Sequence, residues 1–298
     1  MEVLSTTNLS KSYGKIKALN NLNIQINAGE VYGLLGPNGS GKTTTLGIIM
    51  GILAKDNGDF QWFSGQYGNN PRKKIGAILE TPNFYPYLDA YENLEIVCRI
   101  KKVENQDIDE LLKIVNLYER GTSKFRTYSL GMKQRLAIAA TLVGEPEVLI
   151  FDEPTNGLDP EGIAEVRVIL KRIADSGKTV IMASHILDEV EKICSHVIIL
   201  QKGKLLASGP VGSILSDDNT IEIGSENMSV LRNFLETHSA IKDIKDKGSY
   251  FECQIDSSIA PAEVSEKAHS QGLMITHLVV RKRRLEEEFL DITNNENA

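Results

Sequence analysis

Residues 31–43, VYGLLGPNGSGKT, decide the fold of this chain. The apolar run VYGLL predicts a buried strand, and GPNGSGKT fits the phosphate-loop pattern G-x-x-x-x-G-K-[ST] in full. The glycines let the backbone curl so that successive amide groups face a phosphate. A strand precedes the loop and a helical pattern follows it, so we favour a nucleotide site over a simple glycine turn before a helix. The residues assigned to phosphate binding are Gly36, Pro37, Asn38, Gly39, Ser40, Gly41, Lys42, Thr43 and Thr44.

Two side chains of this loop carry specific expectations. Lys42 brings a positive charge to the β- and γ-phosphates, and the Thr43 hydroxyl is placed to ligate Mg²⁺. The loop therefore predicts ATP and Mg²⁺ as cofactors.

A second stretch, VLIFDEP at 148–154, predicts a buried strand that ends in two acids. We expect Asp152 to hold Mg²⁺ and Glu153 to polarise an attacking water molecule, since a general base must reach the proton that it accepts. The alternative is a strand that ends at a solvated acidic turn. His185, in MASHI, follows another apolar strand and so is expected at the same sheet edge, within reach of the γ-phosphate. The competing interpretation is a structural histidine.

A third stretch, YSLGMKQ at 128–134, precedes the helical pattern RLAIAATLVG. Ser129 is a plausible N-cap, and the exposed amides behind it form an anion site. The chain thus has a second phosphate-facing helix start in addition to the phosphate loop.

The first two thirds of the chain alternate apolar strands with helical stretches, which predicts an α/β domain. The turn-prone segment SGPVGSILSDDNT, at 208–220, predicts a boundary, with domains at 1–215 and 216–298. The second part has the order β-α-β-β-α-β of a ferredoxin-like α+β fold, followed by a terminal helix in LEEEFLDIT. The basic run at 281–284 is interpreted as a strand end with a solvated face.

Composition excludes several classes of protein. A formal net charge of −7 argues against a nucleic-acid-coating protein, so no nucleic-acid partner is expected. Three separate cysteines without a CxxC pair argue against a zinc site or a disulfide framework. The apolar runs are much shorter than the ~20 residues of a membrane span.

Together these motifs resemble the ATP-binding subunit of ABC transporters over roughly residues 2–215. The resemblance implies a helical subdomain at about 82–145. It makes YSLGMKQ the signature motif usually written LSGGQ, with Ser129 and Gly131 kept and Leu130 and Met132 replacing a glycine and a glutamine. It also implies that Asp159 is the acid of the D-loop and that Tyr13 stacks on adenine.

The segment AILETPNFYPYLDAYENL departs from the usual family pattern, because Glu80 stands where a glutamine normally contacts Mg²⁺ and the attacking water. This segment resembles the branch that exports or resists bacitracin and lantibiotic peptides. The resemblance also implies a membrane permease that docks near Phe84, Tyr85 and Tyr87, although core packing of these aromatic rings is the alternative. The expected location is cytoplasmic, peripheral on the inner face of the cell membrane.

These residues are compatible with three functions. The favoured one is the ATP-hydrolysing motor subunit of a membrane exporter, acting as a head-to-tail homodimer. The first alternative is a soluble ABC-type ATPase that acts on ribosomes or DNA, and the single phosphate loop and absent basic excess speak against it. The second is a regulatory module that binds nucleotide without hydrolysis, and the intact Lys42, Asp152, Glu153 and His185 speak against it.

Overall fold

The computed structural model describes residues 1–68, 70–79, 83–214, 219–256, 259–281, 285–286 and 289. Contacts within the chain divide it into two compact units, Met1–Val211 and Gly212–Ala298. The division falls a few residues before the position predicted from the turn-prone segment. Each unit is described by itself.

The first unit is built on a six-stranded sheet with the strand order β10-β9-β4-β8-β7-β6. All neighbouring strands run parallel except β10, which is antiparallel to β9. Every residue of β4, β7 and β8 is buried, because helices and strands cover both faces of the sheet. The bounds are β4 (Val31–Leu35), β6 (Ile75–Ile78), β7 (Val148–Asp152), β8 (Thr179–Ser184), β9 (His196–Gln201) and β10 (Lys204–Pro210). The predicted α/β fold with a buried, largely parallel sheet is confirmed.

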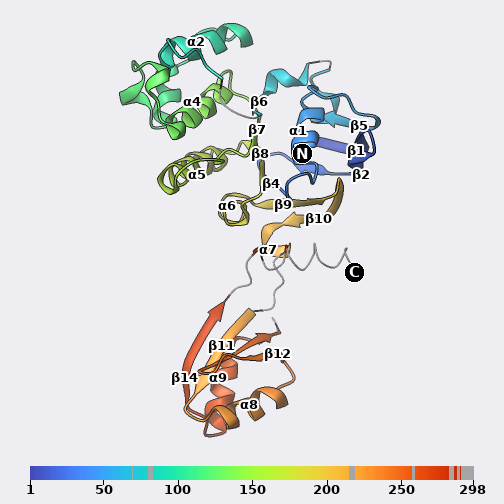
Figure 1. Ribbon diagram of the computed structural model, residues 1–298, viewed down its shortest axis with the longest axis vertical. Coiled ribbons are helices and arrows are strands. Elements are labelled where there is room, and N and C mark those ends of the chain that lie inside the picture. Colours follow the sequence, from blue (N-terminus) through green and yellow to red (C-terminus); the bar gives the residue numbers. More distant parts are fainter. Residues whose placement is uncertain are drawn as a thin grey trace. The chain divides into compact units, whose positions relative to one another are not determined.

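One face of this sheet is covered by the helix α1 (Lys42–Ile49) and by a smaller antiparallel sheet (Figure 1). In the smaller sheet β1 pairs with β2, β3 and β5. Apolar side chains of both sheets and of α1 form one continuous core, which includes Leu4, Leu46 and Ile150. The bounds are β1 (Glu2–Tyr13), β2 (Ile16–Leu22), β3 (Gln25–Asn27) and β5 (Asn57–Trp62).

Helices cover the opposite face, with α4, α5 and α6 beside the sheet and α2 farther out (Figure 1). The packing is close: a Cβ atom at Gly76 would lie 2.2 Å from the Thr141 carbonyl oxygen of α4. The range predicted as a helical subdomain holds α2, α3 and α4. The bounds are α2 (Ala90–Lys101), α3 (Ile108–Ile114), α4 (Leu130–Leu142), α5 (Pro160–Asp175) and α6 (Leu187–Ile193).

The remaining short elements lie in the connections. They are the 3₁₀ turns η1 (Phe63–Gly65), η2 (Pro71–Lys74), η3 (Tyr118–Arg120) and η4 (Phe125–Thr127), and the helix α7 (Val211–Ile214), which begins at the last residue of the first unit.

The second unit has the predicted β-α-β-β-α-β order. Its four strands form one antiparallel sheet in the order β12-β13-β11-β14, so β13 lies between the two strands of a split β-α-β unit. Both helices contribute to its apolar core, through Leu231 and Val264. The bounds are β11 (Asn219–Ser225), α8 (Met228–Thr237), β12 (Ile241–Asp246), β13 (Phe251–Ile255), α9 (Pro261–Ser270) and β14 (Ile275–Arg281). The ferredoxin-like prediction is confirmed.

Two predictions near the C-terminus concern residues that are largely outside the described part. Of the basic run at 281–284 only Arg281 is described, and its Nε atom lies 2.8 Å from Oε1 of Glu222. The predicted terminal helix at 285–293 is outside the described residues except at 285–286 and 289. None of the described helices has both the length and the apolar composition of a membrane span.

Candidate functional site

The phosphate loop connects β4 to α1 and curls around the side chain of its own lysine. The Lys42 ammonium donates hydrogen bonds to the carbonyl oxygens of Gly36 at 2.7 Å and Pro37 at 3.4 Å. Gly41 has a φ of 110°, and a Cβ atom there would lie 2.6 Å from the Ala18 carbonyl oxygen. Only glycine therefore fits this position without displacing the neighbouring backbone.

The other loop residues differ in exposure. Pro37, Asn38 and Gly39 are exposed, whereas Ser40 is buried. In the described part of the chain the Ser40 hydroxyl oxygen is buried without a hydrogen-bond partner. At the start of α1, Thr43 is exposed and Thr44 is half-buried. The loop thus presents exposed backbone and one threonine hydroxyl beside a buried ammonium group.

Glu153 lies directly after β7 and faces this loop. Its Oε1 atom is 3.7 Å from the Lys42 ammonium nitrogen. Its backbone φ is 50°, a left-handed conformation that is uncommon for glutamate, and its amide donates to the Ala183 carbonyl oxygen at 3.0 Å. Uncommon backbone conformations of this kind cluster at functional sites, and this one aims the side chain at the loop. Asp152, the last residue of β7, is buried beside it.

His185 completes the group from the end of β8. Its Nδ1 atom lies 2.7 Å from Oε2 of Glu153, so both oxygens of that carboxylate face a nitrogen atom. The strands β4, β8 and β7 are neighbours and parallel, so their carboxyl ends lie at one edge of the sheet. The structure therefore brings together three predicted site residues that are far apart in the sequence, Lys42, Glu153 and His185.

The oxygen donors near this edge suit a hard divalent cation. Mg²⁺ is usually bound through one or two protein side chains together with substrate phosphates and water. Thr43 offers a hydroxyl oxygen and Asp152 a carboxylate at this edge. Among the described residues no group of three or more His, Cys, Asp or Glu side chains is arranged to hold a metal ion without a bound nucleotide. Glu80 lies outside the described residues.

The second helix start forms a separate pocket. The Ser129 hydroxyl caps α4 and accepts a hydrogen bond from the Met132 amide at 3.2 Å, as the sequence predicts. Asp159 caps α5 in the same way, with the Gly162 amide at 2.8 Å. Both caps line one pocket of about 400 Å³, together with Leu130, Gly131, Met132, Arg135, Gly157, Leu158, Glu161, Gly162 and Glu165.

None of these lining residues belongs to the phosphate loop. The two helices also lie on different faces of the six-stranded sheet, with α1 on one side and α4 on the other (Figure 1). Within one chain, Ser129 and Gly131 are therefore not part of the group formed by Lys42, Glu153 and His185.

Tyr13 is at the end of β1, and 48% of its surface is exposed. The Lys11 ammonium lies 5.6 Å from the centre of its ring, and the same ammonium pairs with Asp56 at 2.8 Å. The ring therefore keeps an accessible surface, as stacking requires.

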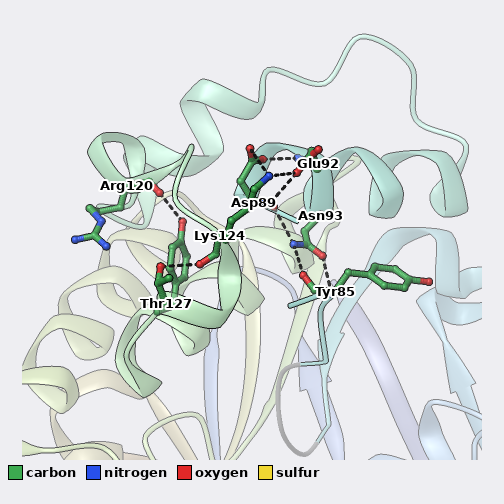
Figure 2. Close-up of polar contacts among 8 residues, drawn as sticks. Tyr85, Asp89, Glu92, Asn93, Arg120, Lys124 and Thr127 are labelled. Carbon is green, nitrogen blue, oxygen red and sulfur yellow. Dashed lines mark hydrogen bonds and ion pairs between the residues drawn. The ribbon is translucent and has the colours of Figure 1, made fainter. Parts of the chain in front are cut away.

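The aromatic segment before α2 divides into a packed ring and two exposed rings. The Phe84 ring lies edge-on to Phe125 with centroids 5.3 Å apart, which favours core packing for this residue. Tyr85 and Tyr87 are 49% and 63% exposed. The buried Asn93 side chain holds the Tyr85 backbone, accepting from its amide at 2.9 Å and donating to its carbonyl at 3.2 Å (Figure 2).

The start of α2 is fixed by a reciprocal cap. Asp89 accepts from the Glu92 amide, and the Glu92 carboxylate accepts from the Asp89 amide (Figure 2). Lys124 also pairs with Glu92, at 3.1 Å. The exposed tyrosines are thus carried by a well-anchored segment.

Glu189 is not among the site residues predicted from the sequence. This residue is on α6 and is almost completely buried, and its Oε2 atom accepts a hydrogen bond from the Thr155 hydroxyl at 2.7 Å. A weak signal exists in the sequence, because Glu189 shares a helical face with the buried Ile193 four positions later.

The fold and the group at the sheet edge define a P-loop nucleotide hydrolase. A family model described as ABC transporter matches residues 19–156. The chain is 38% identical to the uncharacterized ABC transporter ATP-binding protein YhcH of Bacillus subtilis, over 98% of this chain and 96% of the relative. The chain belongs to the ABC transporter ATP-binding proteins, and it is an ATPase that binds ATP.

Other relatives carry more specific names. The bacitracin transport ATP-binding protein BcrA of Enterococcus faecalis is 33% identical over 96% of this chain and 95% of its own. The lantibiotic transport ATP-binding protein SrtF of Streptococcus pyogenes is 42% identical over 68% of this chain and 89% of its own.

Solved structures agree with this fold. The ATP-binding subunit of an ABC transporter has a TM-score of 0.63 and 29% identity, over 71% of this chain and 91% of the other. A dimeric post-hydrolysis state of the ATP-binding cassette MJ0796 bound to ADP and Pi has a TM-score of 0.61 and 29% identity, over 70% and 98% of the two chains.

Proposed function

We propose that this chain is the motor subunit of a membrane exporter that removes antimicrobial peptides of the bacitracin or lantibiotic type. The observation that supports ATP hydrolysis by this motor is the position of Glu153 between Lys42 and His185 at the phosphate loop. The peptide cargo is inferred from the relatives named for bacitracin and lantibiotic transport. The soluble alternative is not favoured, because these relatives are transport proteins.

In the proposed mechanism the loop amides from Gly36 to Thr44 bind the phosphates of ATP. Lys42 exchanges its two carbonyl partners for β- and γ-phosphate oxygens, since its ammonium already lies inside the loop. Glu153 accepts the proton of the attacking water, and His185 orients this carboxylate and contacts the γ-phosphate.

Thr43 and Asp152 are the proposed Mg²⁺ ligands, with Glu80 as a further contact. Bound Mg²⁺ neutralises charge that develops on the phosphate oxygens. Tyr13 supplies the ring that stacks on adenine, consistent with its exposed surface.

We infer that each complete site needs two copies of the chain. Ser129 and Gly131 share a pocket with Asp159 and not with the phosphate loop. In a head-to-tail dimer the amides behind Ser129 of one copy close over the γ-phosphate held by Lys42 of the other. Hydrolysis removes the γ-phosphate that joins the two copies, so the dimer reopens. The exporter uses this opening and closing to drive transport. The dimeric form of the similar cassette supports the formation of a dimer.

The proposed membrane partner is a permease that contacts the exposed rings of Tyr85 and Tyr87, which places the chain on the inner face of the cell membrane. Two exposed aromatic rings on an anchored segment are typical of an interface. Phe84, one residue before Tyr85, anchors this segment through its contact with Phe125.

The test is co-expression with a candidate permease from the same genome, in a host that is sensitive to bacitracin and lantibiotics. We expect the two proteins to co-purify and the host to become resistant, whereas Lys42→Ala in the same pair leaves it sensitive. If the two proteins co-purify and hydrolyse ATP but the host stays sensitive, the proposed peptide cargo is wrong. If the two proteins do not co-purify, the proposed permease partner is wrong.

A further inference from the structure

The loop that joins β7 to α5 is tied to α6 by one buried side-chain contact. The Thr155 hydroxyl donates to Oε2 of Glu189 at 2.7 Å, and the two residues are 2% and 1% exposed. The helix α6 begins at Leu187, two residues after His185. The contact therefore links the loop that carries Glu153 to the helix that follows His185.

Apolar packing alone does not account for a carboxyl group at this position. Burial of a carboxyl group costs stability unless hydrogen bonds replace its lost hydration. In the described part of the chain, the second oxygen of Glu189, Oε1, is buried without a hydrogen-bond partner. Burial raises the pKa of Glu189, although the hydrogen bond from Thr155 and the charge of Arg167 oppose this. A buried polar group that is only partly satisfied calls for a specific explanation.

Thr155 is at the middle of the loop that follows β7. The Asn156 amide donates to the Glu153 carbonyl oxygen at 3.1 Å, and the Leu158 amide donates to the Thr155 carbonyl oxygen at 3.2 Å. The first turn runs from Glu153 to Asn156 and the second from Thr155 to Leu158, so Thr155 belongs to both. Asp159 follows the second turn. A displacement of Thr155 would therefore move the catalytic carboxylate and the cap of α5 together.

We propose that Glu189 is a positioning residue that acts through Thr155: it holds the loop at 153–159 against α6, the helix that follows His185. This keeps the Glu153 carboxylate between Lys42 and His185. The inference rests on the proposed role of Glu153 as the base. Neither Thr155 nor Glu189 contacts the reacting atoms in this account.

The experiment uses the full chain and compares four variants by kcat, KM, affinity for a fluorescent ATP analogue and Tm. Thr155→Val removes the hydroxyl at nearly constant volume, and Thr155→Ser keeps it. Glu189→Gln keeps an acceptor for the hydroxyl. The double variant Thr155→Val with Glu189→Leu replaces the hydrogen-bonded pair by two apolar side chains, which restores favourable burial without the tether.

We expect Thr155→Val to lower kcat by about 10- to 100-fold with unchanged nucleotide affinity, because small displacements of a catalytic group have large effects on rate. Thr155→Ser and Glu189→Gln should retain most of the wild-type kcat. The double variant should regain the wild-type Tm while its kcat stays low.

Two results would overturn the inference. One is a Thr155→Val variant with wild-type kcat. The other is a double variant whose kcat recovers together with its Tm, because the pair would then contribute only to packing. Parallel measurement of Glu153→Gln separates this failure from that of the proposed function. If Glu153→Gln is inactive while Thr155→Val is normal, only the positioning role is lost; if Glu153→Gln is fully active, the assignment of the base itself is wrong.

Discussion

Nδ1 of His185 and Oε2 of Glu153 lie 2.7 Å apart, at the ends of two neighbouring parallel strands. The other oxygen of Glu153 faces Lys42 at 3.7 Å. The carboxylate is thus held from both sides.

This relationship predicts the effect of removing the imidazole. His185→Ala should lower kcat by roughly 10- to 100-fold, because the Glu153 carboxylate loses its orientation. Affinity for ATP should change little, since Lys42 and the loop amides remain. Steady phosphate release and equilibrium nucleotide binding measure the two effects separately. Wild-type kcat in this variant would make His185 a surface residue without a role in turnover.

Two variants of Glu80 separate the role of its negative charge from the role of its oxygen atoms. If its carboxylate contacts the metal and the attacking water, Glu80→Ala should reduce turnover more than ATP affinity, and Glu80→Gln should be tolerated better because it keeps an oxygen ligand. The measurement is kcat over a titration of Mg²⁺. Equal and unchanged rates for the two variants would show that the position is only structural.

If each complete site needs two copies of the chain, ATPase activity should depend on protein concentration. Specific ATPase activity of the purified chain should rise as the dimer forms. Mixing Ser129→Arg, which blocks closure, with Lys42→Ala should restore at most one competent site in each mixed dimer. If activity per chain is constant across the range while the protein stays monomeric by light scattering, turnover does not need Ser129 of a second copy, and the two-copy site is wrong.

The C-terminal unit has its own apolar core, which includes Leu231, Ile223 and Val264. A truncation near Asp217 should therefore leave a soluble fragment that binds ATP with wild-type affinity. Circular dichroism and nucleotide titration test this. An insoluble fragment, or one without nucleotide binding, would mean that the two units need each other to fold.

Much of the fold was predictable from the sequence because local patterns were strong. The predominantly apolar runs at 148–152 and 179–184 indicated strands that are covered on both faces of the sheet. The order of strands and helices in the second unit predicted its split β-α-β topology.

Within the candidate site, motif context predicted Lys42, Glu153 and His185, and strand adjacency explains why they meet. Glu189 has only a weak signal in the sequence, because its importance comes from burial against Thr155, a contact between distant elements. The left-handed backbone of Glu153 has no local sequence signal. The three aromatics at 84–87 were grouped by sequence, yet only packing separates the Phe84 ring from the two exposed tyrosines.

The most direct test of the proposed mechanism is ATP turnover by Glu153→Gln, measured beside its ATP affinity. Glutamine keeps the shape and the hydrogen-bonding capacity of the side chain but cannot accept the proton of the attacking water. We predict that turnover falls by about 10²- to 10⁴-fold while ATP still binds. Turnover that stays within a few-fold of wild type, with binding intact, would contradict the assignment of Glu153 as the catalytic base.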